Sequence, residues 1–118
     1  MEKVNGIGGV FFRARDPETL SAWYEKHLGV NHYIPEPWKQ REGYTVFAPF
    51  AQDTAYFGRS EQQWMINFRV DDLATMIAQL EAAGIKVETN AEWDSEVGKF
   101  ARIHDPEGNP IELWQPNQ

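Results

Sequence analysis

The sequence contains an internal repeat, in which a short alternating segment and the helix-like stretch after it both occur twice. Residues 10–16 recur 56 positions later as residues 66–72. Residues 28–30, Leu-Gly-Val, return 55 positions later as Ala-Gly-Ile at 83–85, and one deletion in the second helix accounts for the change of offset. Each half has about 55 residues, which is marginal for an independent core, so we expect the two halves to pack together around a shared groove.

Each half has the pattern of one strand, one helix and three further strands. Apolar residues alternate with other residues at 10–14 and at 66–70, which predicts the first strand of each half. Asp16 in the first half, and Asp71 or Asp72 in the second, are expected helix N-caps, while Gly29 and Gly84 are expected to end the helices. The further strands are expected at residues 30–33, 44–48 and 54–57, and at 86–89, 100–104 and 111–114.

These elements predict an α+β fold made of two tandem βαβββ modules, at about residues 5–59 and 63–115. The 118 residues are enough for one domain, which we expect to span 1–118.

Composition excludes several classes of function. The net charge of −7 is spread along the chain and no basic stripe is visible, so we expect no nucleic-acid partner. The chain has no cysteine, which excludes disulfides and thiolate chemistry. No apolar run reaches membrane-spanning length and the N-terminus lacks a signal-peptide pattern, so we expect a cytoplasmic protein without membrane contact.

Two stretches carry a family resemblance. The first runs over residues 13–30, and the second over residues 100–113, where Asp-Pro-Glu-Gly-Asn-Pro is followed by Ile-Glu112-Leu. Together they resemble the vicinal-oxygen-chelate superfamily, which includes glyoxalase I, extradiol dioxygenases, fosfomycin-resistance enzymes and bleomycin-resistance proteins. The resemblance implies paired βαβββ modules whose sheets curl around a cavity. In family enzymes this cavity holds a divalent metal, bound by His or Gln on the first strands and Glu on the fourth strands.

The positions that the resemblance implies for the metal carry mostly residues that do not bind one. Only Glu112 matches a ligand by type, and one carboxylate does not make a site for a divalent ion. We therefore expect no cofactor; the alternative is a divalent metal held by Glu112 with an unusual partner such as His32 or His104. The other implied positions fall on Gly9, on Met65 or Trp64, and on Tyr56 or Phe57.

Arg13 and Arg69 occupy matching positions of the two predicted first strands, on the face away from the apolar stripe. Phe11 and Asn67 lie beside them on that face, with Glu112 expected across the cavity. One interpretation is a polar clamp, in which the guanidinium groups bind a carboxylate or phosphate. The other is that Glu112 pairs with an arginine and neutralises charge that the cavity would desolvate.

Trp38 and Trp93 recur at equivalent places in two polar loops. Aromatic side chains in such loops line the mouth of a ligand pocket, anchor a dimer interface or cover the edge of the core. The sequence leaves these three alternatives open.

The leading functional hypothesis is a metal-free protein of the bleomycin-resistance type, binding a small organic molecule in an aromatic groove. The acidic composition suits a cationic planar ligand, and a homodimer is expected because the edge strands need covering. The alternative is a metal-dependent lyase, isomerase or dioxygenase of glyoxalase type, and a third possibility is a chaperone-like or regulatory dimer without ligand. The sequence assigns no catalytic residue and leaves open whether a reaction occurs. The expected ligand-binding residues are Phe11, Arg13, Trp38, Asn67, Arg69, Trp93 and Glu112.

Overall fold

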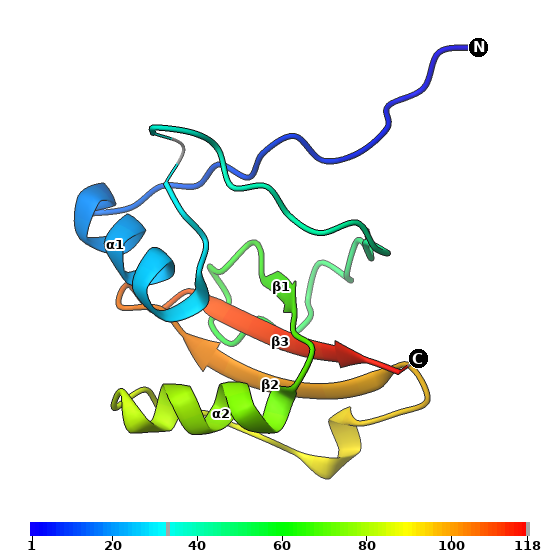
Figure 1. Ribbon diagram of the computed structural model, residues 1–118. Coiled ribbons are helices and arrows are strands. Elements are labelled where there is room, and N and C mark those ends of the chain that lie inside the picture. Colours follow the sequence, from blue (N-terminus) through cyan, green and yellow to red (C-terminus); the bar gives the residue numbers. More distant parts are fainter. Residues whose placement is uncertain (33, 118) are drawn as a thin grey trace.

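The computed structural model describes residues 1–32 and 34–117. Its elements follow the chain from an early helix to a C-terminal hairpin (Figure 1). They are α1 (Pro17–Leu28), β1 (Ile66–Arg69), α2 (Leu73–Ala82), the short 3-10 helix η1 (Ala91–Trp93), β2 (Gly98–His104) and β3 (Pro110–Pro116).

The three strands form a mixed, curled and unclosed sheet in the order β1-β3-β2. β1 runs parallel to β3, and β2 runs antiparallel to it. Beyond β2, Glu88 forms an isolated antiparallel bridge with Arg102, which is what remains of the strand predicted at 86–89. The predicted α+β class is therefore confirmed, and β1 lies at the free edge of the described sheet.

One face of the sheet and one side of each helix form the core. Side chains alternate across a strand, so every second residue of β2 and β3 points to the helices. Four of these have no exposed surface, and α1 and α2 each add two buried side chains to them. The core residues are Leu20, Tyr24, Leu73, Leu80, Ala101, Ile103, Ile111 and Leu113.

Local chemistry begins and ends the helices where the sequence predicts. The Asp16 carboxylate accepts a hydrogen bond from the backbone N–H of Thr19 at 3.2 Å, and Asp72, rather than Asp71, accepts one from Thr75 at 3.0 Å. These hydrogen bonds from Thr19 and Thr75 lower the pKa of both carboxyls below its ordinary value. Past the ends of the helices, Gly29 and Gly84 have φ of 74° and 83°, where a side chain would be strained.

A buried carboxylate, Asp105, fixes the β2–β3 turn against α1. The Tyr24 hydroxyl donates to Asp105 Oδ2 at 2.7 Å, and Asn109 Nδ2 donates to the same oxygen at 2.8 Å. The backbone N–H groups of Glu107 and Asn109 donate to Oδ1 at 2.9 and 3.0 Å. All four donors lie within the protein, so the charge of Asp105 is stabilised although the residue is only 4% exposed.

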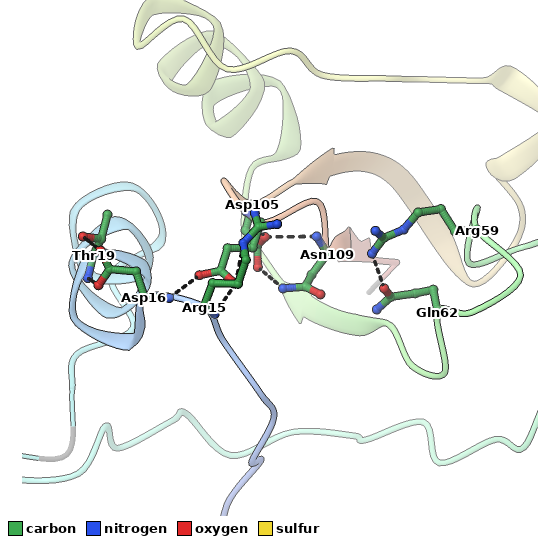
Figure 2. Close-up of polar contacts among 8 residues, drawn as sticks. Arg15, Asp16, Thr19, Arg59, Gln62, Asp105 and Asn109 are labelled. Carbon is green, nitrogen blue, oxygen red and sulfur yellow. Dashed lines mark hydrogen bonds and ion pairs between the residues drawn. The ribbon is translucent and has the colours of Figure 1, made fainter.

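The same turn also holds the chain that enters α1. The Glu107 carboxylate accepts hydrogen bonds from the backbone N–H groups of Arg15 and Asp16, at 2.7 and 3.0 Å. Figure 2 shows Arg15 and Asp16 on the segment that enters α1, and the two hydrogen bonds from Asn109 to Asp105. The turn of the second half therefore positions the helix of the first half.

The first half does not form the strands that its sequence predicts. Before β1, the described chain contains α1 and no strand. Residues 10–14, 30–32, 44–48 and 54–57 are irregular, and Tyr33 of the predicted second strand lies outside the described residues. A strand needs a neighbouring strand for its hydrogen bonds, and no described segment pairs with these. Figure 1 shows the N-terminal segment leaving the body of the molecule.

We expect Asp105→Ala to lower the free energy of unfolding by about 2–4 kcal/mol, because it leaves buried donors without an acceptor. Glu81→Ala is the matched control: this exposed carboxylate on α2 should change stability by less than about 0.5 kcal/mol. Urea denaturation of the three proteins measures the difference. Equal midpoints for Asp105→Ala and Glu81→Ala would show that the carboxylate does not join the turn to α1.

Tyr24 should make the protein sensitive to alkali. Burial, and then its hydrogen bond to Asp105, raise the pKa of Tyr24 well above its ordinary value of 10.0. The unfolded state therefore loses this proton first, so stability falls as pH rises above about 10. We expect Tyr24→Phe to lower this slope by up to about 1.4 kcal/mol per pH unit. Urea denaturation at a series of pH values tests it, and identical slopes would contradict it.

Candidate functional site

A row of three polar side chains crosses the sheet on the face opposite the core. The strand register aligns Asn67 of β1 and Arg102 of β2 with Glu112 of β3. Asn67 Nδ2 donates a hydrogen bond to Glu112 Oε1 at 2.7 Å. Asn67 is exposed, whereas Glu112 and Arg102 are partly buried. The row therefore spans all three strands, and Asn67 is its most exposed member.

Tyr56, from the irregular first half, completes the environment of Glu112. Its hydroxyl donates to Glu112 Oε2, so both carboxylate oxygens accept a hydrogen bond within the protein. Burial raises the pKa of Tyr56 to about 12, with further contributions from the hydrogen bond to Glu112 and from its charge, while Arg102 acts in the opposite direction. Below that pH the phenol of Tyr56 is neutral and can donate its hydrogen bond to the Glu112 carboxylate.

Arg102 contacts two aromatic rings. Its guanidinium carbon lies 4.5 Å from the centre of the Tyr56 ring and 5.5 Å from that of Trp93. Such cation–π contacts contribute about 0.5–2 kcal/mol each, more where water is excluded. Nη2 lies 3.6 Å from Met65 Sδ, and the Nε–H is buried with no hydrogen-bond partner among the described residues. The site thus contains a fixed positive charge with unmet donor capacity.

An aromatic surface continues from this row along the same face. The rings of Phe100 and Trp114 stack with centres 6.2 Å apart and planes 3° from parallel. Trp114 Nε1 donates to the carbonyl of Val97 at 2.9 Å, which fixes the indole. The register places Arg69 next to Trp114. The result is a polar row bordered by flat apolar rings, the composition typical of small-molecule sites.

Arg69 connects this surface to the loop above it. Its Nη2 donates to the carbonyl of Arg41 at 2.8 Å. A Cβ at Gly43 would lie 1.6 Å from Arg69 Nη1, so a larger residue there would move the guanidinium group of Arg69. Arg69 therefore holds residues 41–43 close to the site.

The structure brings together some of the residues that the sequence singled out. Asn67 and Glu112 lie in the polar row, Trp93 contacts its third member Arg102, and Arg69 lies in the next row of the same face. Their role in binding a ligand stays a prediction.

Three other predicted residues lie elsewhere in the described chain. Phe11 is 94% exposed, and Arg13 beside it is exposed as well. The predicted clamp of Arg13 and Arg69 is not formed, because the strand that would carry Arg13 to this face is not paired. The ring centres of Trp38 and Phe68 lie 6.2 Å apart. Phe68 packs on the core side of the sheet. This contact agrees with the interpretation in which Trp38 covers the edge of the core.

The sequence interpretation missed Arg102, and it named Tyr56 only as an implied metal position whose side chain does not suit a metal. Arg102 lies between Ala101 and Ile103, both fully buried, so strand alternation alone places it on the opposite face with Glu112. Tyr56 carries no comparable signal, because it reaches Glu112 from an irregular segment.

The surroundings of Glu112 do not fit a divalent metal. Its two oxygens accept from Asn67 and Tyr56, and its neighbour on β2 is the cation Arg102. Within residues 1–32 and 34–117, no group of three or more His, Cys, Asp or Glu could hold a metal ion. His32 and His104 accordingly form no such set with Glu112 in the described chain.

Comparison with known proteins assigns the family. The model of the glyoxalase-like domain family matches residues 9–114, so the chain belongs to that family and, with it, to the vicinal-oxygen-chelate superfamily. A search of the curated proteins found no significant match.

Two solved structures resemble this one. TnmS3, an antibiotic-binding protein from Streptomyces sp. CB03234, matches over 99% of this chain and 100% of its own, with 21% identity and a TM-score of 0.63. A glyoxalase/bleomycin resistance protein from the same organism is 32% identical over 46% of each chain, with a TM-score of 0.37. The likeness to TnmS3 shows the shared fold. Separately, no helix among the described residues is long and apolar enough to cross a membrane.

We expect the charges beside Tyr56 to shift its pKa in opposite directions. Glu112→Gln removes a cause of the raised value, so the pKa should fall below about 12, whereas Arg102→Met removes the opposing cation, so it should rise. NMR of ring-labelled tyrosine, with the resonance assigned by Tyr56→Phe, measures both shifts. An unchanged titration in Glu112→Gln would contradict the contact between the phenol and the carboxylate.

Proposed function

We propose that the protein binds a small organic molecule on the Glu112 face of its sheet, without a metal, and acts as a binding protein. The observation that carries this proposal is the position of Arg102, fixed between Tyr56 and Trp93 beside Glu112. Positive charge at this point opposes a metal cation. The hydrogen bonds of Asn67 and Tyr56 satisfy the Glu112 carboxylate, which frees Arg102 to meet a ligand.

The surface suits a planar ligand with acceptor oxygens. Flat rings such as Phe100 and Trp114 offer stacking, which contributes about 0.5–1.5 kcal/mol per aromatic pair beyond the area buried. The guanidinium of Arg102 offers donors to a carbonyl, phenolate or carboxylate. This chemistry differs from the cationic planar ligand that the acidic composition suggests, because Arg69 and Arg102 both place positive charge on the face that carries Glu112.

The family supports the same kind of function at a coarser level. The chain is a glyoxalase-like domain, and its fold is shared by an antibiotic-binding protein. We propose that this chain also binds an antibiotic-like molecule. We also propose a cytoplasmic location and a homodimeric state, the latter supported by the exposed apolar side chains of the first half.

Ligand binding can be tested with bleomycin and with a set of planar aromatic phenols and carboxylates as probes. Titration calorimetry should show binding that Arg102→Met weakens at least about tenfold, equal to about 1.4 kcal/mol. Arg15→Met is the matched control, since Arg15 is 82% exposed at its side chain and pairs with Glu107, away from the site. Equal affinities in both variants would contradict the placement of the ligand.

Metal content is a separate test of the metal-free proposal. We expect protein purified without chelator to contain less than a stoichiometric amount of any divalent ion, by elemental analysis. A stoichiometric ion that Glu112→Ala removes would overturn the proposal in favour of a metal-dependent enzyme of glyoxalase type.

A further inference from the structure

A cleft opens beside β2, at the opposite edge of the sheet from β1. Its volume of about 360 Å³ lies within the range of about 300–1,000 Å³ that is typical of small-molecule pockets. The walls come from α1, from the segment that follows α2 and from the end of β2. We call this space the edge cleft; its lining includes Trp23, Ile85, Lys86, Glu88, His104 and Pro106.

The edge cleft lies where two backbones separate. Glu88 and Arg102 exchange both of their backbone hydrogen bonds, at 2.8 and 2.9 Å. The next pair in this register, Lys86 and His104, forms no backbone hydrogen bond within the described chain. The chain instead turns back to α2, because the N–H of Ile85 donates to a carbonyl of that helix at 2.9 Å. The strand predicted here therefore pairs at one position only, and a gap remains beside His104.

This gap leaves the backbone of His104 with unused hydrogen-bonding groups. Alternate residues of an antiparallel strand direct their N–H and C=O groups to the same side. Arg102 directs both groups outward to Glu88, whereas the N–H of Asp105 donates inward, to the carbonyl of Asn109. His104 therefore directs both groups outward as Arg102 does, and no described residue bonds to them there. A ligand with a neighbouring donor and acceptor can pair with His104 as Glu88 pairs with Arg102.

Trp23 supplies a flat wall on the core side of the edge cleft. Its ring centre lies 5.2 Å from that of Tyr24, with planes at 79°, and 5.4 Å from that of His27, with planes at 56°. The side chain also packs against the core, so the indole is held in place while part of it stays exposed. A planar ligand gains free energy by stacking or edge contact with such a ring.

The charged side chains of the edge cleft favour a ligand without net charge. Lys86 and Glu88 bring one charge of each sign to the lining. Asp105 also lines the cleft, but its carboxylate already accepts four hydrogen bonds from the protein. A charged ligand would lose hydration without a matching excess of opposite charge. A neutral polar molecule avoids that cost.

We propose that the edge cleft is a second ligand site, which binds a neutral planar molecule that contains a cyclic amide. The ligand carbonyl accepts from the N–H of His104, the ligand N–H donates to the carbonyl of His104, and the ring lies against Trp23. A lactam or cyclic imide carries this donor and acceptor on one edge. The volume of the cleft suits a molecule of one or two rings. The site lies beyond the Glu112 face and does not depend on the function proposed for that face.

The first test uses two matched probes. Carbostyril is a two-ring lactam, and N-methylcarbostyril has the same rings without the N–H donor. In amide NMR titrations up to about 1 mM, we expect carbostyril to shift the backbone amide signal of His104 and the indole signal of Trp23. The N-methyl compound should bind at least about tenfold more weakly.

Three results of this titration would overturn the proposal. An unchanged His104 signal with carbostyril would show that the edge cleft is not a site for this class of ligand. Equal affinities of the two probes would contradict the hydrogen bonds to the strand edge. Shifts confined to Asn67 and Trp114 would place the probe on the Glu112 face, which would overturn the second site and support the function proposed for that face.

The closing experiment removes the backbone donor of His104. Proline is tolerated on an edge strand where its missing N–H would face away from the sheet, so we expect His104→Pro to stay folded. It should weaken carbostyril binding at least about tenfold, whereas His104→Ala, which keeps the N–H, should bind within about twofold of wild type. Equal affinities of these two variants would overturn the proposal. Trp23→Leu tests the ring without a backbone change: it should weaken binding about two- to tenfold, and unchanged affinity would contradict the assigned wall.

Discussion

The register of β3 against its two neighbours is the constraint on which the rest of the structure depends. Ile111 and Leu113 are fully buried against the helices, and Glu112 lies between them on the other face. A slip of one residue would place the Glu112 carboxylate in the core and two large apolar side chains in water. Core packing and the polar row are therefore fixed by the same pairing.

The turn that contains Asp105 connects the sheet to the helix of the first half. It anchors α1 through Tyr24 and through the backbone ahead of the helix. α1 is consequently part of the core, whereas the chain on either side of it is irregular. Tyr56 and residues 41–43 reach the site only through hydrogen bonds of their own. The site thus combines side chains of the paired strands with segments of the first half whose positions depend on single long-range hydrogen bonds.

The ends of both helices and the C-terminal turn could be predicted from sequence because their signals are local. The caps Asp16 and Asp72, the positive φ of Gly29 and Gly84, and the turn after His104 follow from neighbouring residues alone. The strands predicted in the first half do not form in the described chain. A strand depends on a distant partner, which the local pattern does not specify. Alternation alone would have placed Arg102 on the Glu112 face, although the sequence interpretation missed it. The contact of Tyr56 with Glu112 depends on tertiary structure.

The central claim is that the Glu112 face binds an organic ligand through Arg102 and its flanking rings, without a metal. A crystal structure of the protein with a bound probe from the binding screen tests it most directly. We expect a planar group against Trp93 or Trp114, with an oxygen of the ligand within hydrogen-bond distance of the Arg102 guanidinium. A ligand on another surface, or a metal ion coordinated by Glu112, would contradict it.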